Sequence, residues 1–90
     1  MINILDNTAR HRFELEEEGQ IAFADYSLSG DVIVIPHVES PMALRGKGTA
    51  GRLMTGVLDI VRERKLKVVP SCPYTAAFIQ RHKQYQDLLA

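Results

Sequence analysis

Residues 32–69 read VIVIPHVESPMALRGKGTAGRLMTGVLDIVRERKLKVV, and this stretch decides the fold. It opens with apolar β-branched residues, Val32 to Ile35, which predict a central strand covered on both faces. Apolar residues then recur at the i, i+3, i+4, i+7 spacing of one helical face, which predicts an amphipathic helix over residues 49–64. Residues 66–72 predict another strand. Since a helix joins the two strands, we expect a βαβ unit whose strands are parallel.

The residues before this unit predict an antiparallel hairpin. Residues 12–16 alternate polar and apolar side chains, which is typical of a half-buried strand. Residues 18–20 supply a turn, and residues 21–28 form the second strand. The turn residues 29–31 then lead into the strand that begins at Val32.

A second helix is expected after the last strand. Pro73 and Tyr74 predict its start, because proline is favoured in the first turn of a helix. Its apolar positions are Ala77, Phe78 and Tyr85. The expected fold class is therefore α/β (α+β), a mixed β-sheet with an N-terminal antiparallel meander, a βαβ unit and a C-terminal helix.

Length and charge limit the organisation and the class of the protein. A chain of 90 residues buries one hydrophobic core, so we expect a single domain over residues 1–90. The 11 Lys and Arg residues balance 11 Asp and Glu residues, which argues against nucleic acid or a membrane surface as the partner. No apolar run approaches the roughly 20 residues of a membrane span, so we expect a soluble, cytoplasmic protein. Cys72 is the single cysteine, and no Cys/His spacing predicts a metal site.

The glycine-rich stretch 44–51, LRGKGTAG, joins the first parallel strand to its helix. Glycines let the backbone approach a ligand closely. The unpaired N–H groups of the first helical turn favour an anion, above all a phosphate. Arg45 and Lys47 add positive charge. The alternative is a glycine-rich turn that binds no ligand.

Two common nucleotide motifs do not fit this loop. Gly46, Gly48 and Gly51 have the G-x-G-x-x-G spacing of dinucleotide-binding proteins, but that motif needs an acidic residue after the next strand, where this chain has Ser71 and Cys72. The chain is also too short for two mononucleotide-binding halves. The P-loop pattern fails because no Ser or Thr follows Lys47.

A third pattern, Arg/Gln-x-x-Gly-x-Gly/Ala, is met by Arg45, Gly48 and Ala50. It resembles the acetyl-CoA loop of the GCN5-related N-acetyltransferase superfamily. The resemblance extends to the minimal branch of that superfamily, of about 90 residues, over residues 12–88. The matching pieces are Phe13-Glu14-Leu15, Ile21-Ala22-Phe23, Asp25-Tyr26, His37-x-Glu39-x-Pro41, Ala43 to Gly48, Val68 to Tyr74, Arg81-His82 and Tyr85.

The sequence departs from this branch at two positions. Lys65 stands where a glycine usually ends the long helix, so a lysine is expected in a left-handed conformation. Lys83 stands where proline usually follows His82, so the last helix is expected to run further than in the branch.

The resemblance implies where acetyl-CoA binds. The two parallel strands would splay apart at their carboxyl ends, with the pantetheine arm in the gap beside Glu39 and Ser40. The pyrophosphate would lie on backbone N–H groups of the loop. These belong to Arg45, Gly46, Lys47, Gly48, Thr49 and Ala50. The Thr49 hydroxyl would bind a phosphate oxygen or, alternatively, cap the helix.

Acetyl transfer to an amine requires a base, because the attacking amine must be neutral. His37 and Glu39 are the candidates, since residues two apart on a strand point to the same side. The alternative is a solvated pair at a strand end. Tyr74 is a candidate acid for the departing CoA thiolate, or a packing residue.

Cys72 is the candidate nucleophile. It lies after the second parallel strand and just before a helix N-terminus, where the helix dipole lowers the pKa of a thiol. Cys72 would take the acetyl group from CoA and pass it to the amine. The alternative is direct attack by the amine, with Cys72 packed as a small apolar residue.

The sequence is therefore expected to encode an acetyl-CoA-dependent N-acetyltransferase that acts on a primary amine. No metal is expected to take part. Two other readings stay open. One is a non-catalytic module that binds CoA or acyl-CoA, and the other is an interaction domain whose loop binds nothing.

Overall fold

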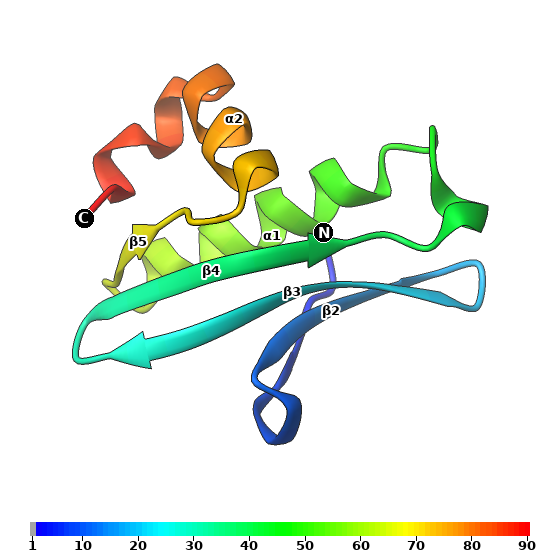
Figure 1. The fold of residues 1–90 in the computed structure, drawn as a ribbon, viewed down its shortest axis with the longest axis horizontal. Helices are drawn as coiled ribbons and strands as arrows, with labels where there is room; N and C mark the ends of the chain where they lie inside the picture. The colour runs from blue at the N-terminus through cyan, green and yellow to red at the C-terminus, as the bar shows by residue number, and fades with distance from the viewer. Residues whose placement is uncertain (1) are drawn as a thin grey trace.

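The computed structural model describes residues 2–90 and contains a five-stranded sheet in the order β1-β2-β3-β4-β5 (Figure 1). The strands are β1 (Leu5–Asn7), β2 (Arg12–Glu17), β3 (Gln20–Ser29), β4 (Val32–Glu39) and β5 (Lys67–Val69). Neighbouring strands from β1 to β4 pair antiparallel, and β4 pairs parallel with β5. The hairpin, the meander and the parallel pair predicted from the sequence are confirmed.

Two α-helices and three 3-10 helices complete the chain, with bounds η1 (Thr8–Arg10), η2 (Met42–Leu44), α1 (Thr49–Glu63), α2 (Pro73–Arg81) and η3 (Lys83–Leu88). The predicted long helix over residues 49–64 is thus confirmed to within one residue. Its buried side chains lie at the predicted spacing, at Leu53, Met54, Val57, Leu58 and Val61.

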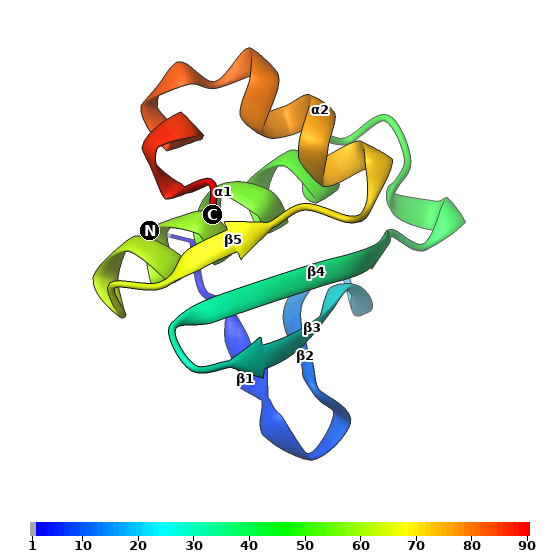
Figure 2. The ribbon, with the colours of Figure 1, turned by 60° about the vertical axis from the view of Figure 1, so that its left-hand side comes forward.

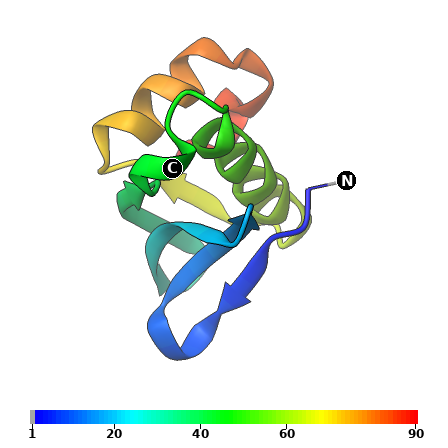
Figure 3. The same cartoon turned by 90° about the vertical axis from the view of Figure 1, so that its right-hand side faces the viewer.

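The hydrophobic core lies between α1 and one face of the sheet (Figure 3). Alternate residues of the strands point to this face and are buried: Phe13, Leu15, Ala22, Ala24, Tyr26, Ile33, Ile35 and Val68. Phe78 and Ile79 of α2 and Tyr85 and Leu88 of η3 complete the core. Arg62 on α1 forms two bonds to Asp87, at 2.8 and 2.9 Å, which join η3 to the end of the helix.

The prediction that β4 is covered on both faces is wrong. Ile33 and Ile35 are buried beneath α1, but Val32 and Val34 on the other face are only partly covered. Among residues 2–90, the long helix α1 covers one face of the sheet and leaves the other face of β4 open. The apolar run therefore forms a strand next to the edge strand β5, with one open face. β1, at the far edge, has no counterpart in the sequence prediction, because three residues carry too little periodicity.

The parallel pair β4 and β5 is short (Figure 2). Pairing joins Val32 to Lys67 and ends at Val34 and Val69, whereas β4 continues to Glu39 with only β3 as its partner. The predicted strand over residues 66–72 is therefore too long, because Pro70 has no N–H to continue the ladder. One more bond, from the Cys72 N–H to the Ile35 carbonyl at 3.0 Å, joins the two segments beyond the sheet.

The second helix differs from prediction at two points. Its buried residues are Thr75, Phe78 and Ile79, and the predicted apolar position Ala77 is exposed. The expected extension past Lys83 is also wrong, because α2 ends at Arg81 and the chain continues as the 3-10 helix η3.

His82 explains this end. Its backbone leaves the helical region at φ −117° and ψ 86°. Its ring stacks on Phe78 with centroids 3.9 Å apart, and its Nδ1 donates to the Phe78 carbonyl at 2.8 Å. His82 therefore binds the free carbonyl end of α2, as its position near the end of the helix predicts.

The expected left-handed lysine is confirmed. Lys65 has φ +58°, and the Leu66 N–H donates to the Val61 carbonyl at 2.9 Å, the bond pattern that ends a helix with a left-handed residue.

We expect Lys65→Gly to raise the free energy of unfolding by about 1 kcal/mol, because glycine avoids the left-handed strain. Chemical denaturation measures this change. Lys83→Gly, at a lysine without positive φ, serves as the control, and an unchanged or lower stability of Lys65→Gly would contradict the account.

Candidate active site

The loop before α1 presents a set of free backbone N–H groups. Gly46 and Gly48 have φ of +79° and +80°, which favours glycine at both positions. Within residues 2–90, the amides of Gly46 and of Gly48 to Gly51 donate to no protein acceptor, whereas Arg52 N–H begins the helical ladder by bonding Gly48. The loop therefore has the geometry of an anion-binding helix N-terminus.

A surface cavity of about 270 Å³ opens beside these amides. It brings together most of the predicted cofactor-binding residues with one from the start of α2. Its lining is Ser40, Leu44, Arg45, Gly46, Gly48, Thr49, Ala50, Gly51 and Tyr74. Ser40 Oγ is buried and has no hydrogen-bond partner in the part of the chain that is described, so it is available to a ligand in this cavity. The predicted Glu39 and Lys47 do not line the cavity.

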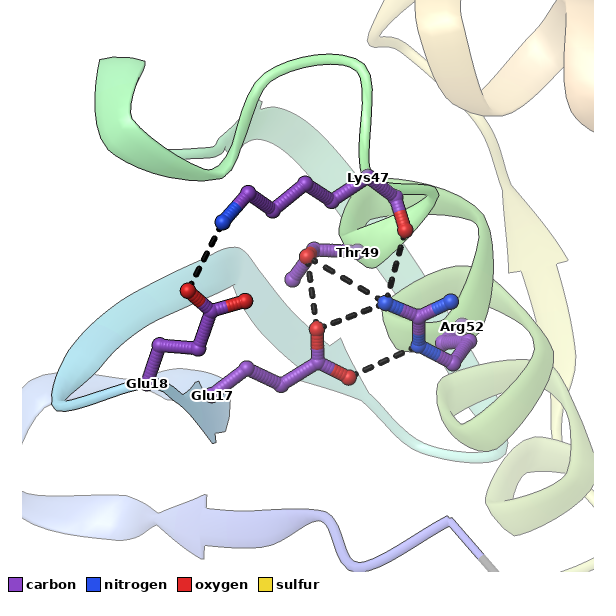
Figure 4. Close-up of polar contacts among 5 residues, drawn as sticks. All are labelled: Glu17, Glu18, Lys47, Thr49 and Arg52. Atoms are coloured by element: carbon purple, nitrogen blue, oxygen red, sulfur yellow. Dashed lines mark hydrogen bonds and ion pairs between the residues drawn. The ribbon is translucent and has the colours of Figure 1, made fainter.

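Side chains from the β2–β3 turn hold the predicted loop residues Thr49 and Lys47 (Figure 4). The Thr49 hydroxyl is buried and donates to Glu17 Oε1 at 2.6 Å. Thr49 is the first residue of α1, and Gly48 is the residue that caps it. The hydroxyl is thus engaged neither as a helix cap nor toward the cavity, and only the Thr49 backbone N–H remains free. Lys47 Nζ lies 2.7 Å from Glu18 Oε1.

Cys72 occupies the gap between β4 and the start of α2. Its side chain is 7% exposed, and it is the residue that precedes α2. Burial raises the pKa of the thiol, but hydrogen bonds from the backbone N–H groups of Thr75, Tyr74 and Val38 and from the Thr75 hydroxyl together outweigh this effect, so that the pKa lies below its ordinary value. The start of α2 and the edge of β4 that β5 leaves unpaired therefore favour the thiolate.

Thr75 adds a polar group to this gap. Its side chain is fully buried, and its hydroxyl is one of the groups whose hydrogen bond to the Cys72 sulfur lowers the pKa of the thiol. The Thr75 hydroxyl therefore supports the charged form of Cys72. The sequence prediction missed Thr75, although its position three residues after the cysteine places it on the same side of the first turn.

Tyr74 links the cavity to the thiol. It lines the cavity, is 40% exposed, and lies two residues after Cys72 in the first turn of α2. Burial is the main cause that raises its pKa, and the charge of Cys72 raises it further. The phenol is therefore protonated at neutral pH and able to donate. Its ring also lies 6.3 Å from Phe78, so the packing reading describes part of its role.

His37 and Glu39 lie together on the open face of the sheet, as their spacing predicts. His37 Nε2 is 3.1 Å from Glu39 Oε1, and both side chains are more than half exposed. Val38, between them, has its N–H beside the thiol of Cys72. The pair therefore lies on the solvent side of the gap. Its exposure is compatible with a role as the base and equally with a solvated pair at a strand end.

The comparison with known protein families identifies the family of the chain. Residues 12–88 match the family described as GCN5-related N-acetyl-transferase. The chain belongs to the GCN5-related N-acetyltransferase family. The enzyme class predicted from the loop is confirmed by this match, and acetyl-CoA is the donor that the family generally uses.

A solved structure agrees with this assignment. The chain is similar to "a GCN5-like putative N-acetyltransferase from Staphylococcus aureus", whose solution structure superposes with a TM-score of 0.68 at 22% sequence identity. The similarity covers 99% of this chain and 88% of the other. At this identity it confirms the GNAT-like fold. Among curated protein sequences, none shows significant similarity.

Metal-binding clusters and membrane-spanning helices are both absent from residues 2–90. No group of three or more His, Cys, Asp or Glu side chains among residues 2–90 is arranged to hold a metal ion. No helix in the same range is long and apolar enough to cross a membrane.

Proposed function

We propose that this protein transfers an acetyl group from acetyl-CoA to a primary amine, with Cys72 as the acetyl acceptor in the first step. One observation carries the proposal: a cavity lined by free amides and a thiol of lowered pKa lie near each other, between the end of β4 and the start of α2. An amide-lined cavity suits a pyrophosphate, and a thiol of lowered pKa lies in the gap beyond Tyr74, which lines that cavity.

The residues of the cavity fit the donor. The free amides of Gly46 and of Gly48 to Gly51 would bind the pyrophosphate, and Arg45 and Lys47 would add positive charge. Ser40 Oγ and the edge of β4 near Glu39 that β5 leaves unpaired would bind the pantetheine arm. A cavity of about 270 Å³ is near the lower limit for small-molecule sites, so the nucleotide would lie on the surface.

The first step forms one bond and breaks one. The Cys72 thiolate attacks the thioester carbonyl carbon, the new sulfur–carbon bond forms, and the bond to the CoA sulfur breaks. Tyr74 would give its proton to the departing CoA thiolate, which its position in the cavity lining and its raised pKa support. The N–H groups around Cys72 would stabilise the oxygen that becomes negatively charged.

The second step transfers the acetyl group to the amine. A neutral amine attacks the acetyl-Cys72 carbonyl, its proton passes to His37 or Glu39, and the Cys72 thiolate leaves. The exposure of the His37–Glu39 pair supports an acceptor that approaches from the open side of the gap. An open site would suit a protein side chain, an N-terminus or a polyamine.

Turnover with a panel of amines tests the proposed function. Acetyl-CoA is supplied with a lysine peptide, a peptide with a free N-terminus and spermidine, and the release of CoA thiol is followed together with the mass of each amine. We expect one class of amine to gain an acetyl group in proportion to CoA release. Binding of acetyl-CoA without transfer to any amine would overturn the enzymatic proposal and favour a CoA-binding module.

A further inference from the structure

The tip of the β2–β3 hairpin holds the start of α1 through Glu17 (Figure 4). This carboxylate accepts from Thr49 Oγ1 at 2.6 Å and from Arg52 Nε and Nη2 at 2.7 Å each. The partners are 32 and 35 positions away in the chain, so these bonds fix tertiary rather than local structure. Hydrogen bonds from Arg52 and Thr49 lower the pKa of Glu17 to about 2, and the carboxylate is charged at neutral pH.

Arg52 carries this contact into the glycine loop. Its Nη2 donates to the Lys47 carbonyl at 2.9 Å. Because the C=O and N–H of a trans peptide point in opposite directions, this bond turns the Gly48 N–H away from Arg52. Gly48 lines the cavity, and its N–H is one of the free amides. Glu17 thus orients a ligand-binding amide through Arg52.

Glu18 acts on the same loop in a different way. Its carboxylate lies 2.7 Å from Lys47 Nζ, and the two side chains are 62% and 48% exposed. An ion pair this exposed is weak and easily exchanged for another partner. It nevertheless places a negative charge on the lysine of a loop that would bind phosphate. The partners of Glu17 belong to α1, whereas the partner of Glu18 is the loop residue Lys47.

We propose that these two adjacent carboxylates set the affinity of the loop for CoA with opposite effects. Glu17 is a positioning residue that holds the loop amides in their binding orientation through Arg52. Glu18 competes with the phosphates of the ligand for Lys47. This inference rests on the proposed binding of CoA to the loop. It assigns control of that binding to a hairpin that is distant from the loop in sequence but in contact with it in the fold.

The test compares two substitutions that remove the same charge. CoA is titrated calorimetrically into the wild type, Glu17→Gln and Glu18→Gln at low and moderate salt. We expect Glu17→Gln to weaken binding about tenfold, the size of a lost charged hydrogen bond. We expect Glu18→Gln to tighten binding about twofold at low salt, and this gain to disappear as salt screens the charges.

The opposite changes in CoA affinity expected for Glu17→Gln and Glu18→Gln distinguish a positioning role from an effect of charge alone. Both substitutions remove a negative charge near the phosphates, so a purely electrostatic role predicts tighter binding for both. Glu17→Gln also leaves Arg52 positively charged, which strengthens that contrast. Arg52→Lys tests the same contact from its other side, because it keeps the positive charge but loses the paired bonds to Glu17, and it is expected to weaken binding as well. It carries the test if Glu17→Gln does not fold.

A matched control lies at the other end of α1. Arg62 makes two bonds to Asp87, as Arg52 does to Glu17, but it lies outside the cavity lining. Arg62→Gln is expected to lower thermal stability and leave CoA affinity unchanged. If the wild type binds CoA and Glu17→Gln binds it with the same or a higher affinity, this inference is overturned. Absence of CoA binding by the wild type would instead overturn the proposed function.

Discussion

Gly48→Val is expected to abolish CoA binding while the protein remains folded. Gly48 has φ +80°, a conformation that costs a β-branched residue about 1–3 kcal/mol. A Cβ atom at this position would also lie 3.1 Å from Arg52 Nη1, the side chain that holds the loop. The loop must therefore change conformation, and the amides lose their common direction. We expect affinity for CoA to fall at least about hundredfold in a calorimetric titration, equivalent to about 2.7 kcal/mol.

Gly30→Val is the matched control for this substitution. Gly30 has φ +62° in the β3–β4 turn, and a Cβ atom there would meet no atom within 4 Å. Valine at Gly30 therefore imposes a similar backbone strain away from the cavity. We expect it to lower stability and leave CoA affinity unchanged. Binding by Gly48→Val with the affinity of the wild type would remove the loop from the proposed site.

Cys72→Ala is expected to abolish acetyl transfer without loss of CoA binding. The thiol is the proposed nucleophile, and alanine has no atom that can take the acetyl group. We expect turnover to fall at least about hundredfold. In the absence of an amine, intact-mass spectrometry should show one added acetyl group on the wild type and none on Cys72→Ala.

The folding and binding of Cys72→Ala serve as its internal controls. The cysteine side chain is small and lies outside the lining of the cavity, so CoA affinity should stay within about twofold of the wild type. Full turnover by the variant would exclude the covalent route. It would instead support direct attack by the amine, with His37 or Glu39 as the base.

Periodicity predicted the elements that bury apolar side chains. The spacing of Leu53, Met54, Val57, Leu58 and Val61 in α1 survives in the structure, because this face is the one that covers the sheet. The same reasoning failed at Val32 and Val34, since an apolar run does not say how many helices are present to cover it. It also failed at Ala77, because the second helix is short and buries Thr75 in place of an apolar residue.

Local sequence signals predicted the loop but not the contacts that hold it. Gly46 and Gly48 mark a left-handed backbone next to a helix start, and both adopt it. Glu17 has no local signal, because its partners Thr49 and Arg52 are more than 30 residues away and meet it only after the sheet has formed. A run of three glutamates at the end of a strand is otherwise typical of a solvated surface.

The position of the candidate nucleophile followed from simple rules. Cys72 was expected at a strand end and just before a helix; the structure places it before α2, but three residues beyond the end of β5. The contribution of Val38 could not be predicted, since it depends on β4 continuing beyond its pairing with β5. That divergence follows from Pro70, which removes a ladder bond, and from tertiary packing that no local pattern encodes.

The most direct test of the account is a calorimetric titration of the unmodified protein with acetyl-CoA, beside NAD and ATP, at moderate salt. The account predicts saturable binding of acetyl-CoA at one site, with no comparable binding of NAD or ATP. Absence of acetyl-CoA binding, or equal binding of all the nucleotides, would contradict the assignment of the glycine loop and its cavity.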